Sequence, residues 1–165
     1  MAMRLCAAVR SHPAWLWATL LLLAGTAVEA QTSGPRFINP PGLTRPTGYT
    51  HVVVSADGRT AYIAGQVAFD SAGKVVGAGD FQAQAEQVFA NLRRALESVG
   101  ASFKDVMKTT TYVTDLKNIP ALRETRARHF DSQHPPANTL IPISALARPE
   151  LLLEIEAVVD LPSGR

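Results

Sequence analysis

The sequence predicts an α+β fold in which two helices cover one face of a mixed β-sheet. Apolar residues alternate with a period of two in strand-like segments and recur every three or four residues in two helical segments, in the order β-β-α-β-α-β-β. Each helix separates two strands, which favours crossover connections within one sheet. With 165 residues, 47% of them hydrophobic, and a formal net charge of +2, the chain is expected to form one domain and not to be disordered.

The first 30 residues have the pattern of a secretory signal peptide. Arg4 and Arg10 precede an apolar run over residues 14–24, and small residues lead to Ala30, with Ala27 as the alternative cleavage site. The run of about 11 residues is far shorter than the roughly 20 that span a bilayer, so no stable membrane anchor is expected after cleavage. The sequence therefore predicts an exported protein, periplasmic or secreted.

Cleavage changes the composition of the chain. Removing 30 of the 165 residues leaves 135, with 14 basic and 13 acidic side chains and without Cys6, the single cysteine. A chain without cysteine suits an oxidising compartment and excludes thiol catalysis and cysteine-based metal sites. The near-neutral balance, with no cluster of Lys and Arg, argues against nucleic acid as the main partner.

The N-terminal half of the mature chain predicts a lead-in and a hairpin. Residues 31–48 are rich in Pro and Gly and are expected to be extended without forming an element. The β-rich segments 51–55 and 61–64 follow, and Asp57-Gly58 between them is a strong hairpin signal.

Two helices with one strand between them come next. Asp80–Val99 has the helical apolar period, with Asp80 as the expected N-cap and Gly100 as the stop. Val106–Val113 is a β-branched strand, and Asn118 is expected to cap the second helix, Ile119–Phe130.

Two strands, Asn138–Ser144 and Leu151–Val159, close the fold. Alternation in the last strand puts Glu154 and Glu156 on one mixed face, roughly 6.5–7 Å apart. A mixed face of this kind is expected to be buried against another subunit, which predicts a homo-oligomer. Acids on such a face have two interpretations: pairing with Arg or backbone amides at the interface, or a pocket acid that positions or activates water.

Other candidate site residues also have two interpretations. Tyr49 is either a core residue or a pocket hydroxyl. Arg123 and Arg126 lie in the second helix, and Arg126 falls on the apolar stripe between Leu122 and Phe130. It is either a snorkelling side chain at the sheet edge or an anion-binding group that faces a cleft.

Metal and dinucleotide sites are not expected. His51, His129 and His134 are scattered and lack the spacing of a helical ligand pair. Gly77 and Gly79 precede a helix without the third glycine of a dinucleotide loop. The sequence therefore predicts neither a metal site nor a dinucleotide site.

Between about Tyr49 and Val159 the chain resembles the RidA (YjgF/YER057c/UK114) family of reactive enamine/imine deaminases. The resemblance rests on the order and spacing of short motifs, which assign residues 49–162 to a RidA-like domain and 163–165 to a tail. The motifs are Gly65-Gln66, Gln84, Asn91, Gly100, Asp105-Val106, Lys108-Thr109-Thr110, Asp115, His134-Pro135-Pro136-Ala137 and Glu154-Ile155-Glu156-Ala157.

The resemblance implies a chorismate-mutase-like fold and a homotrimer whose three sheets form a central barrel, with sites in clefts between subunits. It also implies hydrolysis of 2-aminoacrylate-like enamines or imines to 2-keto acids and ammonia, without metal or organic cofactor. In the family an Arg directly after Pro-Ala holds the substrate carboxylate, a Glu in the last strand holds water, and a Tyr lines the pocket. By position, Tyr49 and Glu154 match the tyrosine and the glutamate.

The family arginine is replaced by Asn138. A charged, bidentate contact is worth roughly 1.5–3 kcal/mol, so its loss would weaken carboxylate binding by about 10- to 150-fold. Arg123 and Arg126 stand where many relatives have Asn and an aromatic residue, and either could supply the missing charge. We therefore expect a deaminase with Glu154 as catalytic residue and Tyr49, Asn138, Arg123 and Arg126 as substrate-binding residues.

Two alternatives remain open: a trimer that binds a small metabolite in the same cleft without turnover, and a protein-interaction role. Export would separate the protein from the cytoplasmic PLP enzymes beside which relatives work, which favours a different substrate or a binding role.

Overall fold

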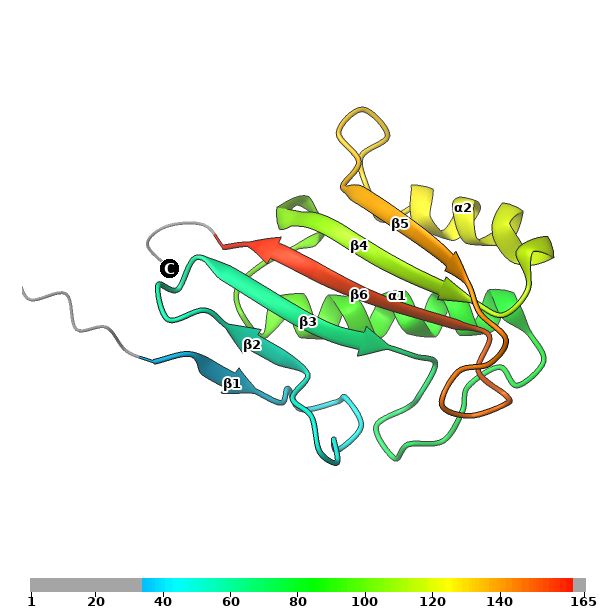
Figure 1. The fold of residues 1–165 in the computed structure, drawn as a ribbon, viewed down its shortest axis with the longest axis horizontal. Helices are drawn as coiled ribbons and strands as arrows, with labels where there is room; N and C mark the ends of the chain where they lie inside the picture. Colours follow the sequence, from blue (N-terminus) through cyan, green and yellow to red (C-terminus); the bar gives the residue numbers. More distant parts are fainter. Residues whose placement is uncertain (1–33, 162–165) are drawn as a thin grey trace, which may run out of the picture. The chain divides into compact units, whose positions relative to one another are not determined.

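A computed structural model describes residues 34–161, which form one six-stranded sheet with the order β1-β2-β3-β6-β4-β5 (Figure 1). Neighbouring strands are antiparallel, apart from the parallel pair β4–β5. Strands β3 and β4 both run antiparallel to β6 and are therefore parallel to each other, so α1 joins two parallel strands. Helix α2 joins the parallel pair β4–β5. Both connections are crossovers, as predicted. The elements are β1 (Arg36–Ile38), β2 (Val52–Val54), β3 (Thr60–Gln66), α1 (Phe81–Glu97), β4 (Val106–Val113), α2 (Ile119–Ala127), β5 (Ala137–Pro142) and β6 (Leu153–Asp160).

Strand β1 corrects the prediction that residues 31–48 form no element. Arg36–Ile38 pairs with β2 at the edge of the sheet, and a strand of three residues is too short to show a period of two. The predicted hairpin at Asp57-Gly58 is confirmed: Gly58 adopts a φ of 70°, and the Asp57 carboxylate accepts a hydrogen bond from the Arg59 amide at 3.0 Å.

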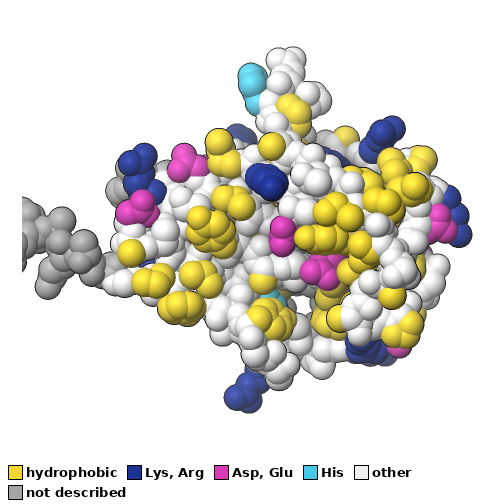
Figure 2. Space-filling model, in the orientation of Figure 1, with side chains coloured by type: hydrophobic (Ala, Val, Ile, Leu, Met, Phe, Trp, Pro, Cys, Tyr) yellow, Lys and Arg dark blue, Asp and Glu magenta, His cyan; other side chains and the backbone are white. Residues whose placement is uncertain are grey.

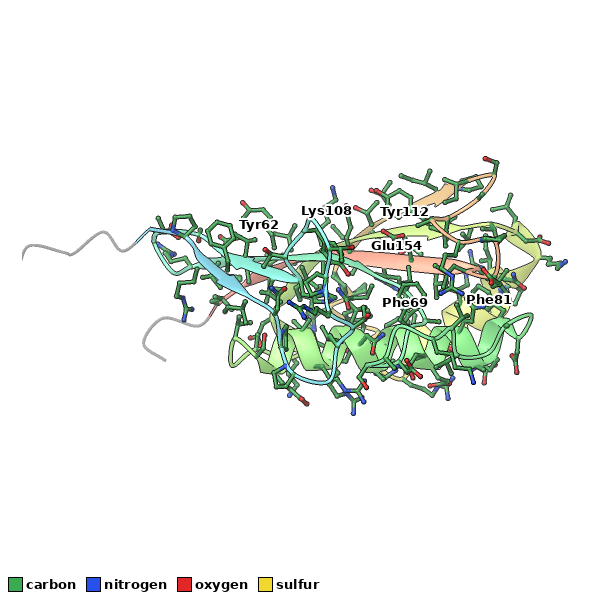
Figure 3. The ribbon with its side chains drawn as sticks, turned by 90° about the horizontal axis from the view of Figure 1, so that it is seen from below. Tyr62, Phe69, Phe81, Lys108, Tyr112 and Glu154 are labelled. Carbon is green, nitrogen blue, oxygen red and sulfur yellow. The ribbon has the colours of Figure 1, made fainter. Side chains whose placement is uncertain are left out.

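Both helices pack against one face of the sheet, as Figures 1 and 3 show. Asp80 caps α1, with its carboxylate accepting from the Ala83 amide at 3.1 Å. The predicted Asn118 cap is wrong, because Asn118 already has helical backbone angles and makes no side-chain cap bond. A 3-10 turn, Leu116–Asn118, runs directly into α2, and Asp115 caps that turn instead. Helix α2 also ends at Ala127, earlier than predicted.

The core lies between the helices and the sheet. In β6, buried residues alternate with partly exposed ones from Leu153 to Val159, which confirms the predicted alternation. On the other face, Figure 2 shows acidic side chains near the middle of the sheet between separate apolar areas. Tyr62 lies on this face with 55% of its surface exposed.

The predicted signal peptide over residues 1–30 and the tail over 163–165 lie outside the described residues. Within 34–161 no helix is long and apolar enough to cross a membrane.

Candidate functional site

Glu154 lies on the face of the sheet that the helices leave uncovered (Figure 3). On β6 it stands opposite Tyr112 of β4, and its carboxylate lies against the backbone of β3 at Gly65. A Cβ atom at Gly65 would overlap the carboxylate of Glu154. The missing side chain of Gly65 therefore makes the space that the Glu154 carboxylate occupies.

The surroundings of Glu154 make its carboxylate more basic. Burial raises the pKa of the Glu154 carboxyl above its ordinary value of 4.5, and the charge of Glu156 raises it further. Burial and the charge of Glu154 also raise the pKa of the Tyr49 hydroxyl, which stays protonated at neutral pH. A carboxylate with a raised pKa can take up a proton from water and return it.

His51 holds Tyr49 in place. The two rings meet edge to face with centroids 5.2 Å apart, and His51 is only 3% exposed. Its Nε2 lies 2.8 Å from the Thr44 carbonyl oxygen and its Nδ1 lies 3.3 Å from the Gln66 amide nitrogen. These contacts fit the tautomer in which Nε2 donates to the carbonyl and Nδ1 accepts from the amide, and they fix the orientation of the ring. Sequence reasoning treated His51 only as a possible metal ligand and missed this supporting role.

Asn138 lies in a second group, at the start of β5. Its Oδ1 atom accepts hydrogen bonds from Thr109 at 2.9 Å and from Thr111 at 3.0 Å. Arg126 of α2 donates to the Thr109 hydroxyl at 3.1 Å, so one chain of hydrogen bonds runs from Arg126 to Asn138. With Oδ1 occupied twice, the Asn138 amide points its N–H donors away from the two threonines.

Around Asn138 there is a cavity of about 320 Å³ between α2 and the edge of the sheet. Arg126 is half-buried there, stacks on Phe130 at 4.6 Å and has no acidic partner in the described part of the chain. Burial lowers the pKa of the Arg126 guanidinium, which still remains charged. Arg123 is exposed. The cavity is lined by Thr111, Ile119, Leu122, Arg123, Arg126, Asn138 and Leu140.

These two groups lie on opposite faces of the sheet. Thr111 pairs with Ile155 and faces the helices, whereas Tyr112 pairs with Glu154 and faces away from them. Asn138 shares the helix-side face, because its side chain bonds to Thr111. One chain therefore brings Tyr49 to Glu154, and brings Asn138 to Arg123 and Arg126. It does not bring Glu154 and Asn138 together.

The comparisons with known proteins agree on one family. The family model described as Endoribonuclease L-PSP matches residues 43–161. A RutC family protein of Synechocystis is 30% identical over 119 residues, which cover 72% of this chain and 90% of the relative. The chain belongs to the RidA (YjgF/YER057c/UK114) family.

Solved structures extend the match to the RidA fold. The structure of RidA from the Antarctic bacterium Psychrobacter superposes with a TM-score of 0.67 at 29% identity, covering 76% of this chain and 98% of that one. The chorismate-mutase-like fold predicted from the sequence is thus confirmed for the single chain. Membership of the RidA family supports a general function of the imine or enamine deaminase type.

No group of three or more His, Asp or Glu side chains that could hold a metal ion occurs in this RidA domain within residues 34–161. Its polar groups instead suit two separate tasks. The Glu154 group can hold and deprotonate water, and the Asn138 group can bind an anion.

Proposed function

We propose that this RidA family protein hydrolyses a small reactive imine or enamine to a carbonyl compound and ammonia. The observation that supports the proposal is the half-buried Glu154 carboxyl, which has a raised pKa and occupies the space that Gly65 leaves open. Water adds through its oxygen to the imine carbon, and the π electrons of the C=N bond move to nitrogen. Glu154 takes one proton of the water and returns it to nitrogen, which gives the carbinolamine. The hydroxyl proton of the carbinolamine then moves to nitrogen, the C–N bond breaks with release of ammonia, and the C=O bond forms. An enamine first tautomerises to the imine by moving a proton from nitrogen to carbon.

The complete site is proposed to form between two copies of the chain. RidA family proteins are typically small homotrimers. One copy would supply Glu154 and Tyr49, and its neighbour would supply Asn138 and Arg126. The opposite positions of these groups in one chain and the exposed apolar residues on the uncovered face support this arrangement. Export to the periplasm or the medium remains part of the proposal.

The test is turnover by purified protein with 2-aminoacrylate generated in the assay, followed by release of the keto acid. Glu154→Gln keeps the shape of the side chain but cannot accept a proton, so we expect kcat to fall by about 10²- to 10⁴-fold. Glu156→Gln is the matched control on the same strand and face. It removes only the smaller cause of the raised Glu154 pKa and leaves burial in place, so it should retain most of the activity. Wild-type turnover by Glu154→Gln, or no acceleration by the wild-type protein, would refute the proposal.

A second candidate function is binding without turnover, favoured by Asn138 in place of the family arginine. A screen of amino acids and keto acids by thermal shift separates the two functions. A ligand that stabilises the protein and is recovered unchanged, combined with failed turnover, supports binding alone. RNA cleavage, which the description of the family model suggests, is not proposed, because a net charge of +2 without a basic cluster gives little attraction for a phosphate backbone.

A further inference from the structure

The cavity beside Asn138 presents hydrogen-bond donors and no acid. Arg123 and Arg126 both line it, and neither forms an ion pair within the described residues. The Asn138 oxygen is used by two threonines, so its free N–H groups add further donors. A half-buried cation with no counter-charge is costly unless a ligand supplies one. The cavity therefore suits an anion.

Its two cations differ in depth. Arg126 is half-buried and is held by the Thr109 hydroxyl and the Phe130 ring, whereas Arg123 is exposed. They stand three residues apart on α2, which separates their Cβ atoms by about 5–6 Å. Each guanidinium group can bind one planar carboxylate through two parallel hydrogen bonds, so two of them at this spacing can hold two carboxylates. The apolar side chains of Ile119, Leu122 and Leu140 can cover a short carbon chain between the two carboxylates.

We propose that this cavity selects a small dicarboxylate, an imine or the corresponding keto acid whose two carboxylates are separated by a short carbon chain. One carboxylate binds at Arg126 and Asn138, and the second binds at Arg123 at the rim. The assignment of this ligand as a substrate rests on the proposed function, whereas its binding does not. The residue that determines specificity would then be Arg123.

The test is calorimetric titration of the full chain carrying Glu154→Gln, which prevents turnover. The four ligands are succinate, succinamate, butyrate and inorganic phosphate. Succinamate has the same length as succinate but carries only one charge. We expect succinate to bind about 2- to 5-fold more tightly than succinamate, because its second carboxylate forms an exposed ion pair with Arg123. The difference in affinity between the two ligands should shrink at high salt, which screens exposed charges. Arg123→Gln should abolish the advantage and leave succinamate binding unchanged. Arg126→Gln should weaken both ligands by about 10- to 150-fold.

Arg128→Gln is the control, because Arg128 lies at the end of the same helix, pairs with Glu86 and does not line the cavity. Its affinities should equal those of the parent. Equal binding of succinate and succinamate, or tighter binding of phosphate than of succinate, would overturn the proposal. If the predicted selectivity appears but the wild-type protein turns over no imine, the proposed function alone fails. If the protein turns over monocarboxylate imines without any preference for succinate, this inference alone fails.

Discussion

At Gly65 the lack of a side chain makes room for the Glu154 carboxylate. Gly65→Ala would push the carboxylate away from strand β3, and a misplacement of about 1 Å can cost 10²-fold in rate, so we expect kcat to fall by about that factor. Gly34→Ala is the control, because a Cβ at Gly34 meets nothing within 4 Å. Turnover and the melting temperature are measured for both variants. A Gly65→Ala protein with full activity would show that the position of Glu154 does not matter for the reaction.

The raised pKa of Glu154 predicts how stability depends on pH. The folded state binds the proton of Glu154 more tightly than the unfolded chain does, so Glu154 destabilises the fold increasingly as pH rises above its ordinary pKa of 4.5. Glu154→Gln should therefore gain free energy of unfolding relative to wild type as pH rises from 4.5 through the folded-state pKa.

The measurement is denaturant unfolding over the range from about pH 4 to 8. Glu150→Gln is a control of opposite sign, because hydrogen bonds from the Glu150 backbone and from Arg148 lower the pKa of Glu150. That variant should lose stability at neutral pH and match wild type in acid. A difference between Glu154→Gln and wild type that stays constant with pH would contradict the prediction.

At the scale of elements, the two helix starts separate what the sequence predicts from what it does not. Asp80 and Asn118 are both favourable cap residues at the start of an apolar period, but only Asp80 makes the cap bond. Asp80→Ala should cost about 0.5–2 kcal/mol of unfolding free energy, whereas Asn118→Ala should cost almost nothing. Equilibrium denaturation of both variants tests this, and an equal loss would mean that Asn118 contributes a cap after all.

The run of β-branched residues predicted the strand Val106–Val113 to the residue, and the strand is held by pairing with β5 on one side and β6 on the other. The edge strand Arg36–Ile38 could not be predicted in the same way, because its three residues depend on pairing with β2. Similarly, the alternation of β6 placed Glu154 on the uncovered face. The side of the sheet that Asn138 faces depends on the register of β5 against β4, and no pattern within β5 encodes that register.

At the scale of the whole molecule, the separation of Glu154 from Arg126 on opposite faces makes the proposed site depend on assembly. Glu154→Gln and Arg126→Gln should each inactivate the protein when present in every subunit. If each site takes Glu154 from one subunit and Arg126 from its neighbour, random co-assembly of equal amounts of the two variants leaves about one site in four with both groups intact. A trimer that contains both variants holds one such site among its three, so purified mixed trimers should recover about a third of wild-type turnover.

Co-expression of the two variants with different affinity tags, followed by tandem purification, isolates the mixed trimers for this assay. The double variant, with both substitutions in one chain, is mixed with wild type as the matched control. There an intact Glu154 meets an intact Arg126 only where two wild-type chains are neighbours, so trimers with two wild-type chains keep one site in three and trimers with one wild-type chain keep none. If the site lay within one subunit, mixing the single variants would restore nothing, because no chain would hold both groups. Recovery in the first mixture therefore requires that the face carrying Glu154 in one subunit meets the face carrying Arg126 in its neighbour. A single chain cannot bring these two groups together, because they lie on opposite faces of its sheet.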